Sequence, residues 1–449
     1  MTTQTQTPAT PTGKKGGSVT TIVVASLMLF SMFFGAGNLI FPPMVGVASG
    51  TNFWPAILGF LAAGVLLPVL AVVAVSISGQ SVRDIGNHGG KFFGIVFSAM
   101  AYLAIGAFYA LPRTGAVSME TAITPLFGWE GFGANVTYNI IFFLVALVLS
   151  WKPNSIIDTL GKFLTPALVI LLFVLITLAS FGAERVPATP SEDYTSSAMV
   201  TGLFEGYNTM DAIAGLAFSI VIVTSLKSKG FKEGKPVVSG TITAAVIAGG
   251  LLAAIYLGLG WIGQTIPNGQ SYESGATLLA DAANSTMGDI GQAVFSAIVI
   301  LACMTTAVGL IVATSEFFVQ LVPKTTYHFW AVLFTLLSIA FAFQGLETVL
   351  AIAVPFITFL YPPAITLIAL TLLQPMVKNA VRFRWAFLLA LWTSVIWSAL
   401  SVLAGQGWLA GIQQLLDISP GQAVGLGWFA PTAIAALIGM GIDFAQRNK

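Results

Sequence analysis

The hydrophobic pattern of the chain is a series of long apolar segments separated by short polar stretches. Each segment approaches the ~20 residues that an α-helix needs to cross about 30 Å of hydrocarbon. The segments cover roughly 20–46, 53–76, 91–122, 135–150, 155–181, 200–226, 237–263, 290–320, 329–344, 347–371, 384–403 and 425–442. Their apolar runs are continuous, whereas a transmembrane β-barrel would show alternation in strands of about 10 residues. The pattern therefore predicts an all-α integral membrane protein with about 12 transmembrane helices.

Composition and charge add an orientation to this picture. Of the 449 residues, 56% are hydrophobic and 8% are charged, against about 25% charged residues in soluble domains. With the N-terminus in the cytoplasm, 16 of the 18 Lys and Arg residues lie on the inner side, and only Arg113 and Arg185 do not. Basic loops face the cytoplasm, so we expect both termini inside. Residues 1–19 are expected to form a disordered cytoplasmic tail and residues 443–449 a second, short one.

Several classes of function are disfavoured by what the chain lacks. Cys303 is the single cysteine, which excludes an internal disulfide and a cysteine-based metal cluster. The sequence has no ATP-binding P-loop and no dinucleotide-binding motif, so we expect no cofactor. His88 and His328 lie in or near predicted cytoplasmic loops and cannot form a catalytic triad within the membrane. We therefore expect neither an enzyme nor a nucleic-acid-binding protein, but a protein whose work is driven by a gradient or by substrate diffusion.

The first apolar segment contains an interruption at Phe33–Pro43, with the sequence FFGAGNLIFPP. Glycine is a weak helix former and proline lacks an N–H donor. A break at this depth leaves backbone groups unpaired, which hydrocarbon tolerates only where protein, water or a solute satisfies them. Discontinuous helices at mid-membrane indicate a substrate and ion site in secondary transporters. The alternative is a kink that lets neighbouring helices pack closely.

The sixth segment contains a second interruption, EGYNTMDAIAG, at Glu205–Gly215. Asp211 lies in the middle of this segment, where a charge costs about 2.5–3.5 kcal/mol on insertion scales. We expect Asp211 to be a cation ligand, a proton carrier or a partner of an unwound helix end. The alternative is that it only caps the second half of the broken helix. A channel, as a further class of function, would show a continuous polar stripe, whereas the polar residues here cluster at the two breaks.

The two interruptions are five spans apart and lie in segments that start on opposite sides of the membrane. This arrangement is typical of an inverted-topology repeat with a site between its halves. We therefore predict a transport core at 20–371, with repeat one at about 20–181 and repeat two at about 200–371. Two additional transmembrane helices follow at 384–442. The sequence SYESGATLLADAA in the outer loop 264–289 has helical character and is a candidate for a short outer cap.

The strings FSMFFGAGNLIFPP (30–43) and EGYNTMDAIAGLAF (205–218) resemble the bacterial branched-chain amino acid:cation symporters of the BrnQ-type or LIVCS family. The resemblance covers nearly the whole chain. It implies a LeuT-like 5+5 inverted repeat plus two extra helices, with helices 1 and 6 broken at mid-membrane. It also implies uptake of leucine, isoleucine and valine with a coupling cation, usually Na⁺, across the bacterial inner membrane. Membrane lipid is then a further partner, and an oligomeric partner is not predicted.

The resemblance also implies a set of cation ligands. In the LeuT-like pattern, an Asn after the first break, carbonyls just before it, and a small residue followed by two hydroxyl residues on helix 8 hold Na⁺. The matching residues are Ser31, Phe34, Asn38, Ala302, Thr305 and Thr306. The last three share one helical face. The alternative is that each threonine bonds back to a carbonyl of its own helix.

Candidate substrate ligands surround the same breaks. The α-carboxylate is expected at N–H groups around Gly35–Gly37, at the positive end of a half-helix. The family pattern adds a tyrosine on helix 3, and the ammonium is expected at carbonyls of the second break. The predicted substrate residues are Phe34, Gly35, Ala36, Gly37, Tyr109, Tyr207, Asn208, Thr209 and Asp211.

The remaining charges in or near the spans are expected to be structural. Arg113 and Glu120 are predicted to be ions at the rim of an outer vestibule, or to form an outer gate with each other or with Glu205. Glu316 is expected to pair with a cytoplasmic base. Two functional alternatives stay open, namely H⁺ coupling through Asp211 and transport of other small neutral amino acids.

Overall fold

The computed structural model describes residues 19–79, 81–181, 188–272, 274–344, 346–377, 381–408 and 410–446. Every regular element in these ranges is helical. The predicted N-terminal tail lies outside the described residues except for Val19, at which the first helix begins. Residues 447–449 of the predicted C-terminal tail also lie outside them, whereas 443–446 continue the last helix.

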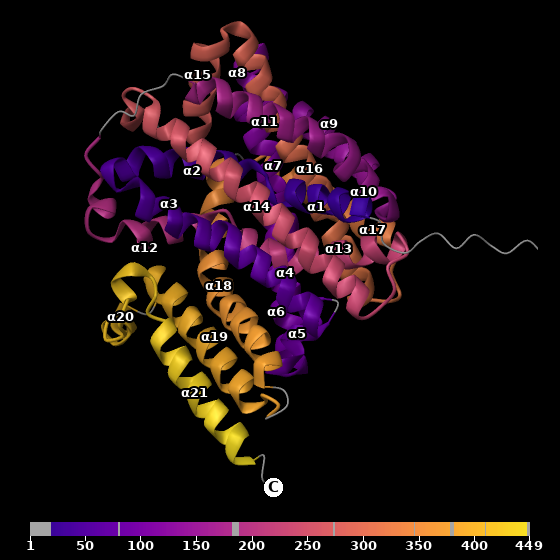
Figure 1. The fold of residues 1–449 in the computed structure, drawn as a ribbon, viewed down its shortest axis with the longest axis vertical. Helices are drawn as coiled ribbons and strands as arrows, with labels where there is room; N and C mark the ends of the chain where they lie inside the picture. Colours follow the sequence, from indigo (N-terminus) through magenta and orange to yellow (C-terminus); the bar gives the residue numbers. More distant parts are fainter. Residues whose placement is uncertain are drawn as a thin grey trace, which may run out of the picture.

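The α-helices are numbered in chain order (Figure 1). In the first half they are α1 (Val19–Phe33), α2 (Ala36–Ser49), α3 (Phe53–Leu61), α4 (Leu67–Ser78), α5 (Val82–Gly86), α6 (Lys91–Leu103), α7 (Ala110–Ser118), α8 (Thr124–Phe127), α9 (Phe132–Ser150), α10 (Ile156–Thr159) and α11 (Thr165–Ser180). In the second half they are α12 (Glu192–Asn208), α13 (Asp211–Ser228), α14 (Lys235–Thr265), α15 (Gly275–Met287), α16 (Asp289–Leu321), α17 (Tyr327–Ala342), α18 (Leu346–Val377), α19 (Trp385–Gly405), α20 (Ala410–Leu416) and α21 (Phe429–Gln446).

The helices follow the predicted apolar segments. Among the described residues, 10 helical stretches are long and apolar enough to cross a membrane, and α1 and α17 are shorter apolar helices. One of the stretches, Gly37–Ser78, joins the second half of the first predicted segment to the whole of the second. The first segment corresponds to α1 and α2, and the sixth to α12 and α13. The predicted all-helical membrane fold is confirmed, whereas the division into two repeats stays a proposal.

Pro42 and Pro43 lie inside α2 and do not end it. Prolines in a helix interior remove N–H donors, but in a membrane neighbouring helices can compensate for this loss. Here the backbone of α14 lies directly against α2. A side chain at Gly263 would collide with the carbonyl of Pro43, and one at Gly46 would collide with α14. Small residues of this kind let spanning helices approach closely, so the prolines mark a packing contact.

The accessory helices α19 and α21 lie side by side, and α18 connects α19 to the rest of the bundle (Figure 1). The carboxylate of Asp443 on α21 accepts hydrogen bonds from the N–H groups of Arg384, Trp385 and Ala386, over 2.9–3.0 Å. These N–H groups begin α19, where donors lack partners within the helix. Asp443 therefore fixes the N-terminal end of α19 against α21.

The segment 264–289 contains the helix α15, as its sequence predicts. Ser274 precedes the helix, and its hydroxyl oxygen accepts from the N–H of Ala276 over 3.1 Å. α15 packs against α2 and α16, and its Gly275 lies against the carbonyl of Ile40. The helix therefore packs on α2, the second half of the first broken span.

Candidate substrate and cation site

The first span is interrupted at Phe34 and Gly35. The N–H of Phe34 still donates to the carbonyl of Phe30 over 2.8 Å. The N–H of Gly35 instead donates to Oδ1 of Asn38 over 3.1 Å. Asn38 therefore caps the half-helix α2, whose first residue is Ala36. The predicted break is confirmed, and it lies at the glycine rather than at the prolines.

The second break consists of Thr209 and Met210, between α12 and α13. Met210 has a φ of +64°, which is uncommon for a residue with a side chain. The hydroxyl of Thr209 donates to the carbonyl of Gly206 over 2.8 Å and lies 3.4 Å from the N–H of Asp211. This predicted break is confirmed as well.

A buried polar cluster joins the two breaks. The amide of Asn38 donates to Oδ2 of Asp211 over 2.6 Å, and the hydroxyl of Tyr256 on α14 donates to the same oxygen over 3.0 Å. Asn38 also contacts the Tyr256 hydroxyl. A buried carboxylate needs such partners. Asp211 does not act as a cap, because Met210 occupies the cap position of α13 and makes no side-chain hydrogen bond there.

A set of oxygen atoms lies where α1 meets α16. The hydroxyl of Thr305 lies 3.0 Å from the carbonyl of Ser31 and 3.1 Å from that of Ala302. The hydroxyl of Thr306 lies 3.2 Å from the carbonyl of Ser31 and 3.3 Å from that of Met32. Both threonines therefore contact carbonyls of α1, and the alternative in which each threonine bonds only within its own helix is wrong. Oxygen-only sets of this kind suit hard cations.

The third predicted segment is also broken, which the sequence analysis did not anticipate. α6 passes into a π-helical turn at Ala104–Phe108, where Gly106 has non-helical φ and ψ of −83° and −119°. Tyr109 follows with φ −145° and ψ −73°. Pro112 has no N–H to donate to the carbonyl of Phe108. Gly106 and Pro112 on either side of Tyr109 were the signal for this break.

Arg113 lies at the centre of the protein. Its guanidinium donates to the hydroxyl of Tyr109 and lies over the ring, with Cζ 4.6 Å from the ring centre. A side chain on Gly37 would come within 2.9 Å of Nη2, so Arg113 packs against the first turn of α2. Arg113 is 7% exposed. The prediction that it is a rim ion is wrong, because the break at Gly106–Tyr109 turns α7 toward the breaks of the other spans.

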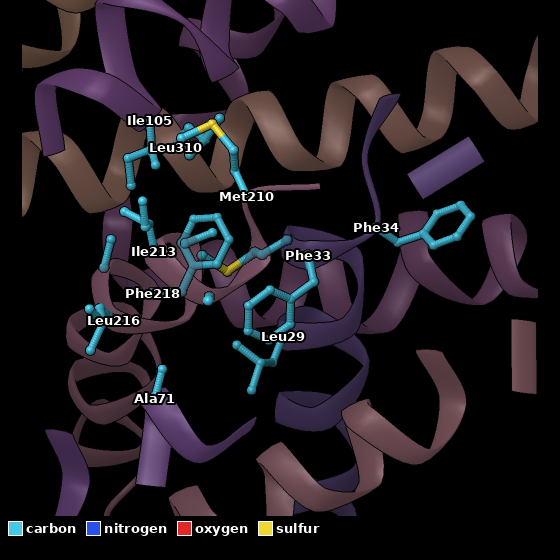
Figure 2. Packing of buried hydrophobic residues seen from close by; sticks show 14 of the residues in the cluster. Leu29, Phe33, Phe34, Ala71, Ile105, Met210, Ile213, Leu216, Phe218 and Leu310 are labelled. Atoms are coloured by element: carbon cyan, nitrogen blue, oxygen red, sulfur yellow. The ribbon is translucent and has the colours of Figure 1, made fainter. Parts of the chain in front are cut away.

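A cavity of about 30 Å³ lies between the three breaks. Its apolar wall includes Met32, Phe33, Ile105, Met210, Phe218 and Leu310. Its polar wall includes Gly35, Asn38, Arg113, Thr209, Asp211 and Thr306. Figure 2 shows Phe33 and Phe218 gathered with Met210, whereas Phe34 points away from them. The cavity thus has an anion, a cation and an apolar surface within one small space.

Residues 18–446 match the family profile described as branched-chain amino acid transport protein. The chain belongs to this family. The branched-chain amino acid permease BrnQ of Corynebacterium glutamicum is 50% identical to this transporter over 427 residues, covering 95% of this chain and 96% of that protein. The BrnQ permease of Bacillus subtilis is 37% identical over 425 residues, covering 94% and 96%.

Solved structures show that this transporter has the LeuT-like fold. Mhp1, a nucleobase-cation-symport-1 family transporter in a closed conformation with bromovinylhydantoin bound, matches with a TM-score of 0.61 at 12% identity, covering 94% of this chain and 91% of that one. MhsT in complex with L-phenylalanine matches with a TM-score of 0.55 at 17% identity, covering 96% and 99%. Membership of the branched-chain amino acid transport family makes the protein a transporter and not an enzyme.

Not all predicted ligands of the transporter meet at the central cavity. The ring of Phe34 stacks on Phe30, with centres 5.4 Å apart. Tyr207 and Asn208 line a different cavity, beside α18 and α19. Oδ1 of Asn38 accepts from the N–H of Gly35, whereas the hydroxyl of Thr305 lies against carbonyls of Ser31 and Ala302. The binding roles of these four residues, Phe34, Asn38, Tyr207 and Asn208, stay predictions. The same holds for the backbone groups of Ala36 and Gly37.

Two members of the site were missed by sequence reasoning, for different reasons. Tyr256 is a single hydroxyl within a long apolar helix, and the sequence carries no signal of its partners. Arg113 was noticed, but its depth could not be judged without the break in the third span. Tyr256 contacts Asn38 and Asp211, which the sequence did select, and Arg113 lines the same cavity as these two residues.

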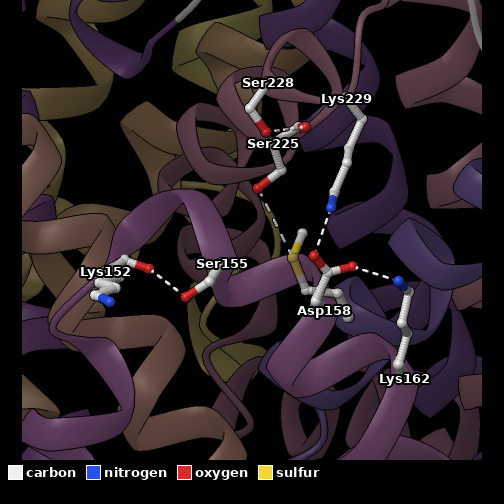
Figure 3. Close-up of polar contacts among 8 residues, drawn as sticks. Lys152, Ser155, Asp158, Lys162, Ser225, Ser228 and Lys229 are labelled. Carbon is white, nitrogen blue, oxygen red and sulfur yellow. Dashed lines mark hydrogen bonds and ion pairs between the residues drawn. The ribbon is translucent and has the colours of Figure 1, made fainter. Parts of the chain in front are cut away.

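Ions join the segment that contains α10 to the end of α13 (Figure 3). Asp158 lies 2.8 Å from Nζ of Lys162 and 2.5 Å from Nζ of Lys229. Together with the first residues of α1, these three residues surround a small pocket. Glu316, for which an ion pair was predicted, takes part in none of the ion pairs found among the described residues. Its Oε2 lies 3.3 Å from the hydroxyl of Thr224 on α13.

Proposed function

We propose that this transporter imports leucine, isoleucine and valine by symport with Na⁺, through alternating access. The observation that carries the proposal is that Arg113 and Asp211 both line the same small cavity between the breaks, together with a largely apolar wall. An amino acid is a zwitterion, so it needs one group of each sign. In this proposal the guanidinium of Arg113 holds the α-carboxylate, and the ammonium lies near Asp211 and Thr209.

The apolar wall supports a branched aliphatic side chain as the third part of the substrate. Phe33 and Phe218 pack edge to face, with ring centres 5.6 Å apart, beside Ile105 and Leu310. One methylene in such a pocket is worth only about 1–3 kcal/mol. We therefore expect leucine, isoleucine and valine to compete for one site. Other small neutral amino acids, which bury less apolar surface, are expected to bind more weakly.

The size of the cavity makes conformational change part of the mechanism. A space of about 30 Å³ has room for about one or two water molecules and not for a leucine. Substrate binding therefore requires the half-helices to move apart. A ligand shifts the equilibrium between the closed and the open conformation only by the difference in its affinity for the two. In this proposal the cation and the substrate, bound together, provide that difference.

The contact of α1 with α16 supports Na⁺ as the coupling ion. Carbonyls of Ser31 and Ala302 and hydroxyls of Thr305 and Thr306 present oxygen atoms to one another. A cation bound there would tie α1 to α16 and close the inner path. Thr306 also lines the central cavity, so a cation bound beside it would lie next to the substrate.

The buried cluster of Asp211, Asn38 and Tyr256 favours a second candidate, H⁺ coupling. A carboxylate between two half-helices can take up a proton from one side and release it to the other. The two candidates differ in the group that binds the ion, namely the oxygen atoms beside Thr306 for Na⁺ and Asp211 for H⁺.

Uptake into proteoliposomes tests both candidates. Labelled isoleucine would be offered under an inward Na⁺ gradient or under a pH gradient, with the wild type and Asp211→Asn. Accumulation that needs Na⁺ supports the proposal. Accumulation driven by the pH gradient alone and lost in Asp211→Asn would replace Na⁺ with H⁺. Failure of folded protein to accumulate any branched-chain amino acid in either arm would overturn the substrate assignment.

We further propose that the transporter lies in the bacterial inner membrane with both termini in the cytoplasm. The proposal rests on the 16 Lys and Arg residues that this orientation assigns to the inner side. A tag at either terminus should then be accessible to protease in inverted membrane vesicles and protected in intact spheroplasts.

A further inference from the structure

A second cavity, which we call the side cavity, lies between the core and the accessory helices. Its volume is about 420 Å³, more than ten times that of the central cavity. It is bounded by the last turn of α12, the middle of α18 and the second half of α19, and by the segment that contains α20. The size is suited to a small molecule.

The chemistry of the side cavity differs from that of the central one. None of the described residues that line it is charged, so it offers no partners for a zwitterion. Phe204, Ile357 and Trp428 give it apolar walls. A ligand of this cavity would therefore be uncharged and largely apolar.

Trp397 carries a hydrogen-bond donor at the side cavity. Its indole N–H is buried and has no hydrogen-bond partner among the described residues. The amides of Asn208 and Gln413, which also line the cavity, donate to Glu205 and Asp417. A buried donor without an acceptor is unfavourable, and tryptophan N–H groups usually find a partner. An acceptor oxygen on a ligand would satisfy this N–H once the indole turns toward the cavity.

The side cavity touches the part of α12 that leads into the second break. The hydroxyl of Tyr361 on α18 donates to the carbonyl of Tyr207 over 2.7 Å, and their rings lie 4.7 Å apart. The same carbonyl accepts from the N–H of Met210 over 2.9 Å. Both tyrosines line the cavity. An occupant would therefore rest against the hinge about which α12 has to move.

We propose that the side cavity binds an uncharged small molecule with an apolar body and an acceptor oxygen, and that its occupant slows transport by holding α12 against α18. The hydrogen bond from Trp397 orients the ligand. The absence of charge separates this ligand from the zwitterionic substrate. Inhibition through the side cavity is consequently noncompetitive with substrate.

N-acetyl-L-leucinamide is a suitable probe because both ends of the amino acid are capped and it carries carbonyl oxygens. Initial rates of leucine uptake into proteoliposomes would be measured over a range of leucine concentrations, with and without the probe. We expect the maximal rate to fall while KM stays unchanged. In Trp397→Phe, which removes the N–H and keeps an aromatic ring, the probe concentration for half inhibition should rise about tenfold, the usual effect of one hydrogen bond.

Two further variants complete the test. Ser401→Leu fills the side cavity and should make uptake insensitive to the probe while uptake itself persists. Trp392→Phe is the matched control. Trp392 lies elsewhere on α19, and its N–H already donates to the carbonyl of Gly89, so this variant should keep full sensitivity to the probe. A rise in KM without loss of maximal rate, equal inhibition of wild type and Trp397→Phe, or no inhibition at millimolar probe would each overturn the proposal.

Discussion

The side-chain amide of Asn38 donates to Oδ2 of Asp211 over 2.6 Å, although 173 positions separate the two residues. Each residue belongs to a different broken span, and each lies within four residues of its break. The hydrogen bond therefore couples two half-helices whose relative movement the proposed mechanism requires. Because Oδ1 of the same Asn38 caps α2, a change at this residue affects both the cap and the coupling.

Asn38→Ala should destabilise the protein by about 1–3 kcal/mol, because it leaves a buried carboxylate with one partner fewer and an uncapped half-helix. The loss should be smaller when Asp211→Asn is already present, since the two residues contact each other. The measurement is the free energy of unfolding, obtained by thermal unfolding of the purified wild type, both single variants and the double variant. Strict additivity would show that the two side chains are not coupled.

Arg113→Gln should raise the KM for leucine at least tenfold, because the carboxylate loses its charged partner. Arg113→Lys should recover part of this loss, since lysine keeps the charge but not the planar fork. Initial uptake rates over a range of leucine concentrations give KM and maximal rate separately. An unchanged KM in Arg113→Gln would remove Arg113 from the binding site and leave it only a packing role with Tyr109.

Sequence reasoning found the two breaks because Asn38 and Asp211 are polar residue types that a spanning helix rarely places at mid-depth, and because Gly35 is a weak helix former. These inferences depend on local chemistry, which the sequence states directly. The choice of Ala302, Thr305 and Thr306 came from the family resemblance, and helical spacing placed these three residues on one face.

The rest of the site depends on which helices meet, and a single sequence does not state that. Tyr256 is a partner of Asp211 because α14 packs against α2 and α13, and this packing cannot be read from the sequence of α14. Tyr207 and Asn208 were chosen for their closeness to the break in the chain, yet they line the side cavity. Met210 adopts a positive φ that its residue type does not predict.

Thr306→Ala should raise the Na⁺ concentration for half-maximal uptake about tenfold and leave the fold intact. The hydroxyl contributes an oxygen atom that faces α1, and removing it takes one ligand from the proposed Na⁺ set. Thr314→Ala is the matched control, because within the described part of the chain its hydroxyl bonds to carbonyls of its own helix, those of Leu310 and Ile311. Sodium dependence of leucine uptake should be unchanged in the control, and equal shifts in both variants would contradict the assignment.

Lys229→Ala should open the inner path more than Lys162→Ala, although both lysines contact Asp158 (Figure 3). Lys162 lies four residues from Asp158 on the same span, whereas Lys229 follows α13 and connects two spans. Exposed ion pairs are worth at most about 1 kcal/mol, so we expect the open population to rise no more than about fivefold. The measurement is the rate at which a charged thiol reagent labels Ala214→Cys, which lines the central cavity, in inverted vesicles with Cys303 replaced by alanine. Faster labelling with Lys162→Ala than with Lys229→Ala would place the closure of the inner path elsewhere than at the contact of α10 with α13.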